Sequence, residues 1–62
     1  MEARTIIPLF RAHGTSAEQL AAAIGLKHRS HMRVWLHRGS TIPEEHHDAI
    51  RREADKLGIE LP

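Results

Sequence analysis

The chain has 62 residues, no cysteine and a formal net charge of +1 at pH 7. With no disulfide or thiolate metal site available, a chain this short must be stabilised by a helical core, by dimerisation or by both. No apolar run approaches the roughly 20 residues that cross a bilayer, and the first residues are not a signal peptide. We therefore expect one domain over residues 1–62, located in the cytoplasm and too small to enclose a deep catalytic pocket.

The acidic residues are distributed unevenly along the chain. Residues 20–43 contain four bases and no Asp or Glu, which gives this span a charge of +4. Its bases are Lys27, Arg29, Arg33 and Arg38. Residues 44–62 contain six acids and three bases, a charge of −3. A basic segment next to an acidic one fits a protein that presents one face to phosphates.

The first segment with helical periodicity covers residues 6–13. Thr5 is its expected N-cap, which places Pro8 in the first turn, where a missing N–H costs nothing. Ile6 and Phe10 share one face of this helix because they are four residues apart. The segment therefore predicts a short amphipathic helix.

The second predicted helix opens at "TSAEQ". Ser16 and Gln19 have the spacing of a capping box, and Thr15 with Glu18 is the alternative register. Apolar residues then follow at helical spacing, and Gly25 is the expected left-handed stop.

The third predicted helix covers about residues 29–38. A helical projection places Met32, Trp35 and Leu36 on one side, and we expect Trp35 to be the central packing unit of the domain. The opposite side carries Ser30, Arg33, Val34 and His37. That side is short, polar and cationic, which suits the edges of base pairs.

The fourth predicted helix begins at Pro43, with Glu44 and Glu45 in its first turn, where the helix dipole favours acids. It is expected to turn Ile50, Ala54 and Leu57 inward and to end at Gly58, with Ile59 folding back after the cap. No alternating pattern of useful length predicts a strand. The expected fold is all-α with four main helices.

The join between the second and third helices resembles the helix-turn-helix of the small phage repressors of the Cro family. The resemblance lies in the apolar helix "LAAAIG", a turn, the apolar Met32 and Trp35, and "RGSTIPEE", where Ile-Pro opens the next helix. Ala21 allows close approach of another helix, and Gly25 permits a tight positive-φ turn. The chain is also similar to small prophage antitoxin-type regulators. The likeness covers about residues 16–54, with the helix-turn-helix at about 16–38.

The resemblance implies a lambda-repressor/Cro-like bundle that binds an inverted-repeat operator in double-stranded DNA as a homodimer. Such a protein represses transcription by occluding a promoter. It would be encoded by a phage or prophage and act in the bacterial cytoplasm. It needs no cofactor, metal or small-molecule substrate, and it is not an enzyme.

The turn departs from the family pattern. The first core residue of the recognition helix usually lies six positions after the turn glycine, but here the sixth is His31 and the apolar Met32 is the seventh. The turn is therefore expected to be one residue longer. Counted back from Trp35, the base-facing positions that the resemblance implies are His28, Arg29, Ser30, Arg33, Val34 and His37. With the phosphate-contacting residues, the expected DNA-binding set is Ser16, Lys27, His28, Arg29, Ser30, Arg33, Val34, His37 and Arg38.

Other functions compete with DNA binding. His28 with His31, and His46 with His47, suggest a metal site, but the last two side chains point about 100° apart on a helix. No Ser, His and acid arrangement indicates catalysis. The serious alternative is a small helix-turn-helix protein used as a protein-binding module, such as an antitoxin or a phage-encoded inhibitor. Retention on DNA or heparin as salt is raised would distinguish it from a DNA-binding protein.

Overall fold

In the computed structural model, residues 1–62 form four α-helices and one short 3-10 helix. In chain order they are α1 (Ala3–Ala12), α2 (Ala17–Ala23), α3 (Ser30–Arg38), η1 (Glu44–His46) and α4 (His47–Leu57). The only β pairing is a single antiparallel bridge between Glu2 and Thr41. The expected all-α fold with four main helices is therefore confirmed. None of the helices has the length and apolar character needed to cross a bilayer.

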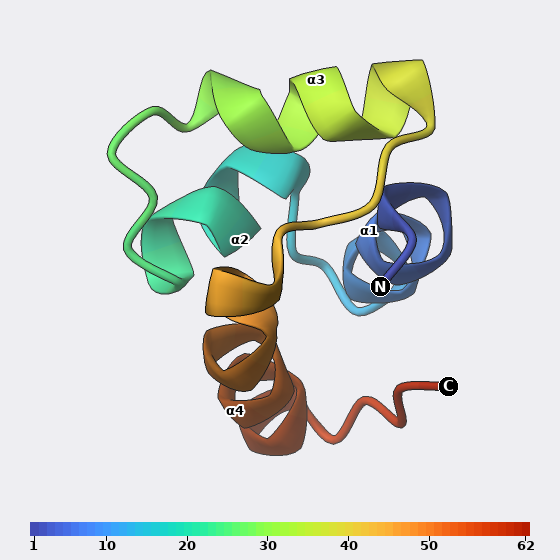
Figure 1. Ribbon diagram of the computed structural model, residues 1–62. Coiled ribbons are helices and arrows are strands. Elements are labelled where there is room, and N and C mark those ends of the chain that lie inside the picture. Colours follow the sequence, from blue (N-terminus) through green and yellow to red (C-terminus); the bar gives the residue numbers. More distant parts are fainter.

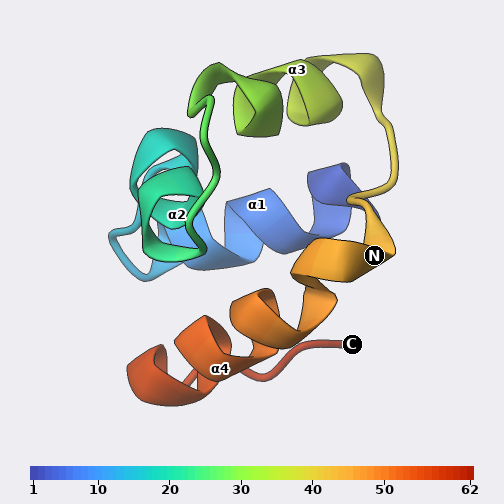
Figure 2. The ribbon, with the colours of Figure 1, turned by 60° about the vertical axis from the view of Figure 1, so that its left-hand side comes forward.

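The helix α3 lies along one edge of the molecule and α4 lies at the opposite edge, with α1 and α2 between them (Figures 1 and 2). α3 packs against both α1 and α2, which also pack against each other. Every element except η1 contributes to one apolar core. Its twelve buried residues are Ala3, Ile6, Ile7, Phe10, Ala17, Leu20, Ala21, Met32, Ile42, Ile50, Ala54 and Ile59.

The start of α1 differs from the sequence prediction. The helix begins at Ala3, so the predicted start at residue 6 with Thr5 as N-cap is wrong. Two backbone hydrogen bonds fasten this end to the loop after α3. Ala3 N–H donates to the carbonyl of Ser40 at 3.1 Å, and Ile42 N–H donates to the carbonyl of Met1 at 2.7 Å. A contact across about 40 residues leaves no local signal in the sequence.

Because α1 starts early, Pro8 lies inside the helix and not in its first turn. Its ring removes the N–H that would bond to the carbonyl of Arg4, an interaction that an interior helical residue normally makes. Arg4 and Pro8 are both exposed, and the free carbonyl of Arg4 can therefore bond to water. Burial of the four apolar residues Ala3, Ile6, Ile7 and Phe10 stabilises the helix.

The capping of α2 matches the sequence prediction. Ser16 N–H donates to Gln19 Oε1 at 2.8 Å, and Gln19 N–H donates to Ser16 Oγ at 3.1 Å, which completes the capping box. At the other end Gly25 has φ +79°, and Leu26 N–H donates to the carbonyl of Ala21 at 2.9 Å. This is the Schellman arrangement that a left-handed glycine permits.

A side chain of α1 caps the C-terminus of α3. Arg4 Nε donates to the carbonyl of Leu36 at 3.0 Å, and Arg4 Nη2 donates to the carbonyl of His37 at 2.7 Å. A cation is favourable there because the last carbonyls of a helix carry partial negative charge. The helix ends at Gly39, whose φ of +67° turns the chain away. Arg4 therefore fixes the distance between α1 and the end of α3.

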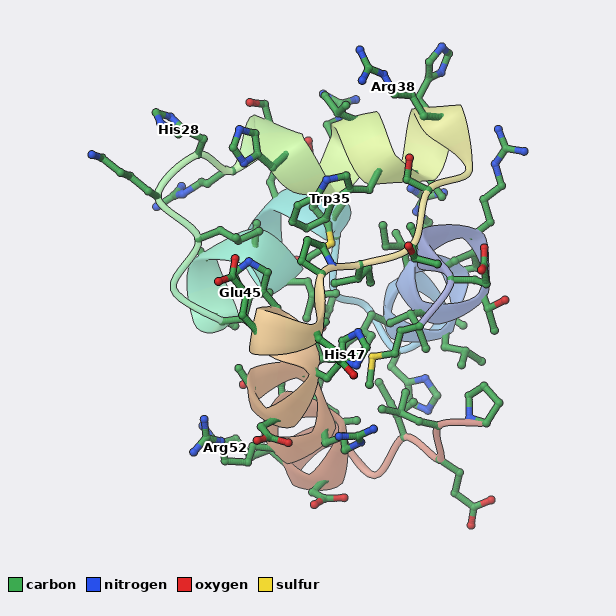
Figure 3. The ribbon with its side chains drawn as sticks, in the orientation of Figure 1. His28, Trp35, Arg38, Glu45, His47 and Arg52 are labelled. Carbon is green, nitrogen blue, oxygen red and sulfur yellow. The ribbon has the colours of Figure 1, made fainter.

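Trp35 is not the central packing unit that the sequence predicted. It is half-buried and points from α3 toward η1, between the rings of His31 and His46, whose centroids lie 6.0 and 5.9 Å from its own (Figure 3). The largest fully buried side chain is Phe10 of α1. Met32 is the only residue of α3 that is fully buried in the core, with 0% of its surface exposed.

The entry into α4 also differs from the prediction. Pro43 precedes η1 with an extended backbone, and α4 begins only at His47, so Pro43 is not its first residue. The side chain of His47 donates from Nε2 to the carbonyl of Ile42 at 2.8 Å. Ile42 is itself buried, so the chain must descend into the core before it can turn into α4.

At the C-terminal end, Ile59 folds back as predicted. It is buried, and its N–H donates to the carbonyl of Ala54 at 2.9 Å. Leu61 is half-buried against the same core. Leu57, which was expected to point inward, is 38% exposed. Ile59, and not Leu57, therefore belongs to the core.

The core assignment predicts an order of stability. Phe10→Ala should lower the free energy of unfolding by about 3–5 kcal/mol, the usual cost of deleting a fully buried large aromatic side chain. Trp35→Ala should cost less, because Trp35 is only half-buried. Urea unfolding followed by circular dichroism measures both variants without relying on tryptophan fluorescence. An equal or larger loss for Trp35→Ala would contradict the assignment.

Two glycines test the capping of α3 by Arg4. Gly39 and Gly58 have nearly the same left-handed backbone, with φ of +67° and +71°, so an alanine strains both by about 1 kcal/mol. A Cβ at Gly39 would also lie 3.0 Å from Arg4 Cζ and Nη1, whereas one at Gly58 meets nothing within 4 Å. Gly39→Ala should therefore be the more destabilising change.

The extra loss of stability in Gly39→Ala, compared with Gly58→Ala, should vanish when Arg4 is first replaced by alanine. Thermal unfolding of the two glycine variants in each background gives this comparison. Equal losses for Gly39→Ala and Gly58→Ala in the wild-type background would show that the Arg4 guanidinium moves aside freely and does not cap α3.

Candidate nucleic-acid interface

The outer face of α3 carries the side chains that the sequence placed opposite the core. Ser30, Arg33, Val34 and His37 are all exposed, while Met32 on the other side is fully buried. Burial of Met32 together with exposure of His31 confirms that the seventh residue after Gly25 takes the core position, as expected for a longer turn. The rotation of α3 is therefore the one obtained by counting back from Trp35.

Cationic side chains continue beyond this face at both ends of α3. Lys27 and His28 lie in the connection of residues 24–29, and Arg29 immediately precedes the first residue of α3; all three are exposed. His28 and Arg38 lie at opposite ends of α3 and extend away from the body of the protein (Figure 3). The row of potential contacts is thus as long as the helix itself.

Arg11 of α1 adds a cation that is absent from the DNA-binding set expected from the sequence. It lines an open groove together with residues of α3, namely Ser30, Arg33, Val34, Leu36, His37 and Arg38. Arg4 and Arg11 are seven residues apart, so they share one face of α1. That spacing could have identified the side of α1 that faces α3, but the contact between the two helices could not be read from the sequence.

One carboxylate approaches the basic face. Glu18 Oε2 of α2 lies 2.9 Å from Nε of Arg33, and the two side chains are 42% and 71% exposed. At this exposure the pair contributes at most about 1 kcal/mol to stability. Its effect on the orientation of Arg33 is the more important consequence for the face of α3.

Ser16 lies at the N-terminus of α2 and is half-buried. Its hydroxyl oxygen accepts the capping hydrogen bond from Gln19 N–H, so it is already engaged as an acceptor. The hydroxyl proton remains free to donate to an anion. Ser16 directly precedes the first turn of α2, and that turn also carries Glu18, the partner of Arg33.

Four of the six histidines lie in two arrangements. His28, His31, Trp35 and His46 form a chain of tilted ring contacts, with the centroids of His28 and His31 5.2 Å apart. His47 instead bonds to the backbone of the loop. No three His, Asp or Glu side chains come together in a geometry that could hold a metal ion.

Comparison of the chain with protein-family models, curated proteins and solved structures gave no match.

Proposed function

We propose that this protein binds double-stranded DNA sequence-specifically through α3, with α2, the turn at residues 24–29 and α3 as a helix-turn-helix. The observation that carries the proposal is the exposed face of Ser30, Arg33, Val34 and His37 on a helix that Met32 holds in one rotation. An α-helix fits the major groove, where each base pair presents a distinct pattern of donors and acceptors.

The residue types divide into base-reading and phosphate-binding groups. Arg33 reads a guanine edge, Ser30 and His37 bond to base edges, and Val34 contacts a thymine methyl. The side chains at the ends of the face bind phosphates, by charge or by hydrogen bonds, and fix the position of the helix. These are Ser16, Lys27 and Arg38, with Arg11 added from α1. His28 and Arg29, which directly precede α3, stay with the base-facing positions.

The way α2 and α3 are joined supports the same proposal. Ala21 of α2 is fully buried, and its small side chain is compatible with the packing of α2 against α3. Gly25 ends α2 in the left-handed conformation and allows the chain to turn toward α3. Both features are expected for a Cro-like repressor of phage or prophage origin. Such a protein represses transcription by occluding a promoter and requires no chemistry of its own.

A single α3 reads only a few base pairs, so we infer that the protein acts as a homodimer on an inverted repeat. Two copies place their recognition helices about 34 Å apart, one turn of the duplex. The sequence alone would place the pairing surface on the aliphatic residues around the last glycine, Leu57, Ile59 and Leu61. Ile59 is buried, however, and Leu61 is half-buried in its own chain. Leu57 is the one large aliphatic side chain left exposed on α4, and we place the contact there.

Selection of bound sequences from a random duplex pool tests the function directly. The proposal predicts enrichment of an inverted repeat, with half-sites about ten base pairs apart and binding about a thousandfold tighter than to random duplex. Affinity should fall steeply as salt is raised. No enrichment, together with loss of all DNA retention at low salt, would instead favour the protein-binding module.

Arg33→Ala should weaken binding to the selected sequence by about 1–3 kcal/mol and relax the preference at one base pair in each half-site. Arg52→Ala is the matched control, since Arg52 is an exposed arginine on α4 and the charge change is the same. Titration of both variants against the selected duplex and its single-base variants gives the result. An equal loss on every sequence would make Arg33 a phosphate contact.

Leu57→Gln tests the pairing surface with no change in charge. It should lower affinity for the operator and make binding more dependent on protein concentration, because pairing and DNA binding are thermodynamically linked. The melting temperature of the free protein should hardly change, since Leu57 is exposed. Sedimentation with and without operator measures the association. Unchanged pairing on the operator would exclude Leu57 from the interface.

A further inference from the structure

Glu18 is an unexpected residue to find beside a face that meets phosphates. It is the only carboxylate within ion-pair distance of a lysine or arginine of α3. In the first turn of α2 its charge also interacts favourably with the helix dipole, but an acid at any first-turn position would do this. A carboxylate near DNA opposes binding to phosphate, so its presence at Arg33 calls for a reason specific to that pair.

The geometry of the pair suggests that reason. The carboxylate contacts Nε, the inner nitrogen of the Arg33 guanidinium, at 2.9 Å. The two terminal nitrogens lie at the outer end of the side chain and can still form a bidentate contact with a base edge. The side chain of Arg33 is 71% exposed, so without a partner its long stem would sample many orientations.

We propose that Glu18 is a specificity-determining positioning residue, which restrains Arg33 and reserves its terminal nitrogens for a guanine edge. This inference rests on the proposed DNA-binding function. The carboxylate also partly neutralises Arg33, so the arginine gains less from pairing with a phosphate of arbitrary sequence. Glu18 thereby lowers non-specific binding and holds the side chain ready for the base edge.

Glu18→Gln tests the inference, with Glu44→Gln as a control that removes one exposed acid of η1 that forms no ion pair. Affinity for random duplex should rise about two- to fivefold in Glu18→Gln, in the range expected for loss of an exposed ion pair. The ratio of specific to non-specific affinity should fall about fivefold or more, as expected when a base contact is loosened. Glu44→Gln should leave that ratio unchanged.

The same measurements in an Arg33→Ala background separate positioning from a general charge effect. If Glu18 acts through Arg33, Glu18→Gln should no longer alter the specificity ratio there. A persistent effect would mean that the carboxylate repels phosphates on its own, and the inference would be wrong. Thermal unfolding of each variant checks that α2 remains formed.

The outcomes also distinguish this inference from the function on which it rests. If wild-type protein selects a sequence but Glu18→Gln matches Glu44→Gln in specificity, the positioning role is overturned and the DNA-binding function stands. If wild-type protein selects no sequence and is not retained on duplex at low salt, both are overturned.

Discussion

Burial of Met32 is the constraint on which the candidate interface depends. It is the only residue of α3 that is fully inside the core, and its side chain sets the rotation of the helix about its own axis. Since successive residues are separated by about 100°, that rotation sends Ser30, Arg33, Val34 and His37 to the solvent. A rotation by a single residue would bury His31 and displace the whole exposed set.

Two contacts hold α3 in place along its length. At its C-terminal end, the guanidinium of Arg4 bonds to two carbonyls of the helix. On the side toward η1, the half-buried Trp35 lies between His31 and His46. The hydrogen bonds between residues 1–3 and residues 40–42 also fasten the loop after α3 to the start of α1. A rigid support of this kind lets a short helix present side chains in fixed positions.

The sequence predicted those features that depend on neighbouring residues. The capping box at Ser16, the left-handed glycines and the two faces of α3 all follow from local spacing and are present. The start of α1, the contribution of Arg11 and the ion pair of Glu18 depend on which elements meet in space. Trp35 was misplaced for the same reason, since hydrophobic periodicity gives the side of a helix but not how deeply each residue on it is buried.

The exposed face of α3 is the surface that we propose contacts DNA. Amide chemical shifts of isotope-labelled protein, titrated with the selected duplex, test it most directly because they report on every element at once. Contact through α3 should place the largest shifts in α3, the connection at residues 24–29 and the first turn of α2. Largest shifts in α4 and the C-terminal tail, with α3 unaffected, would contradict it.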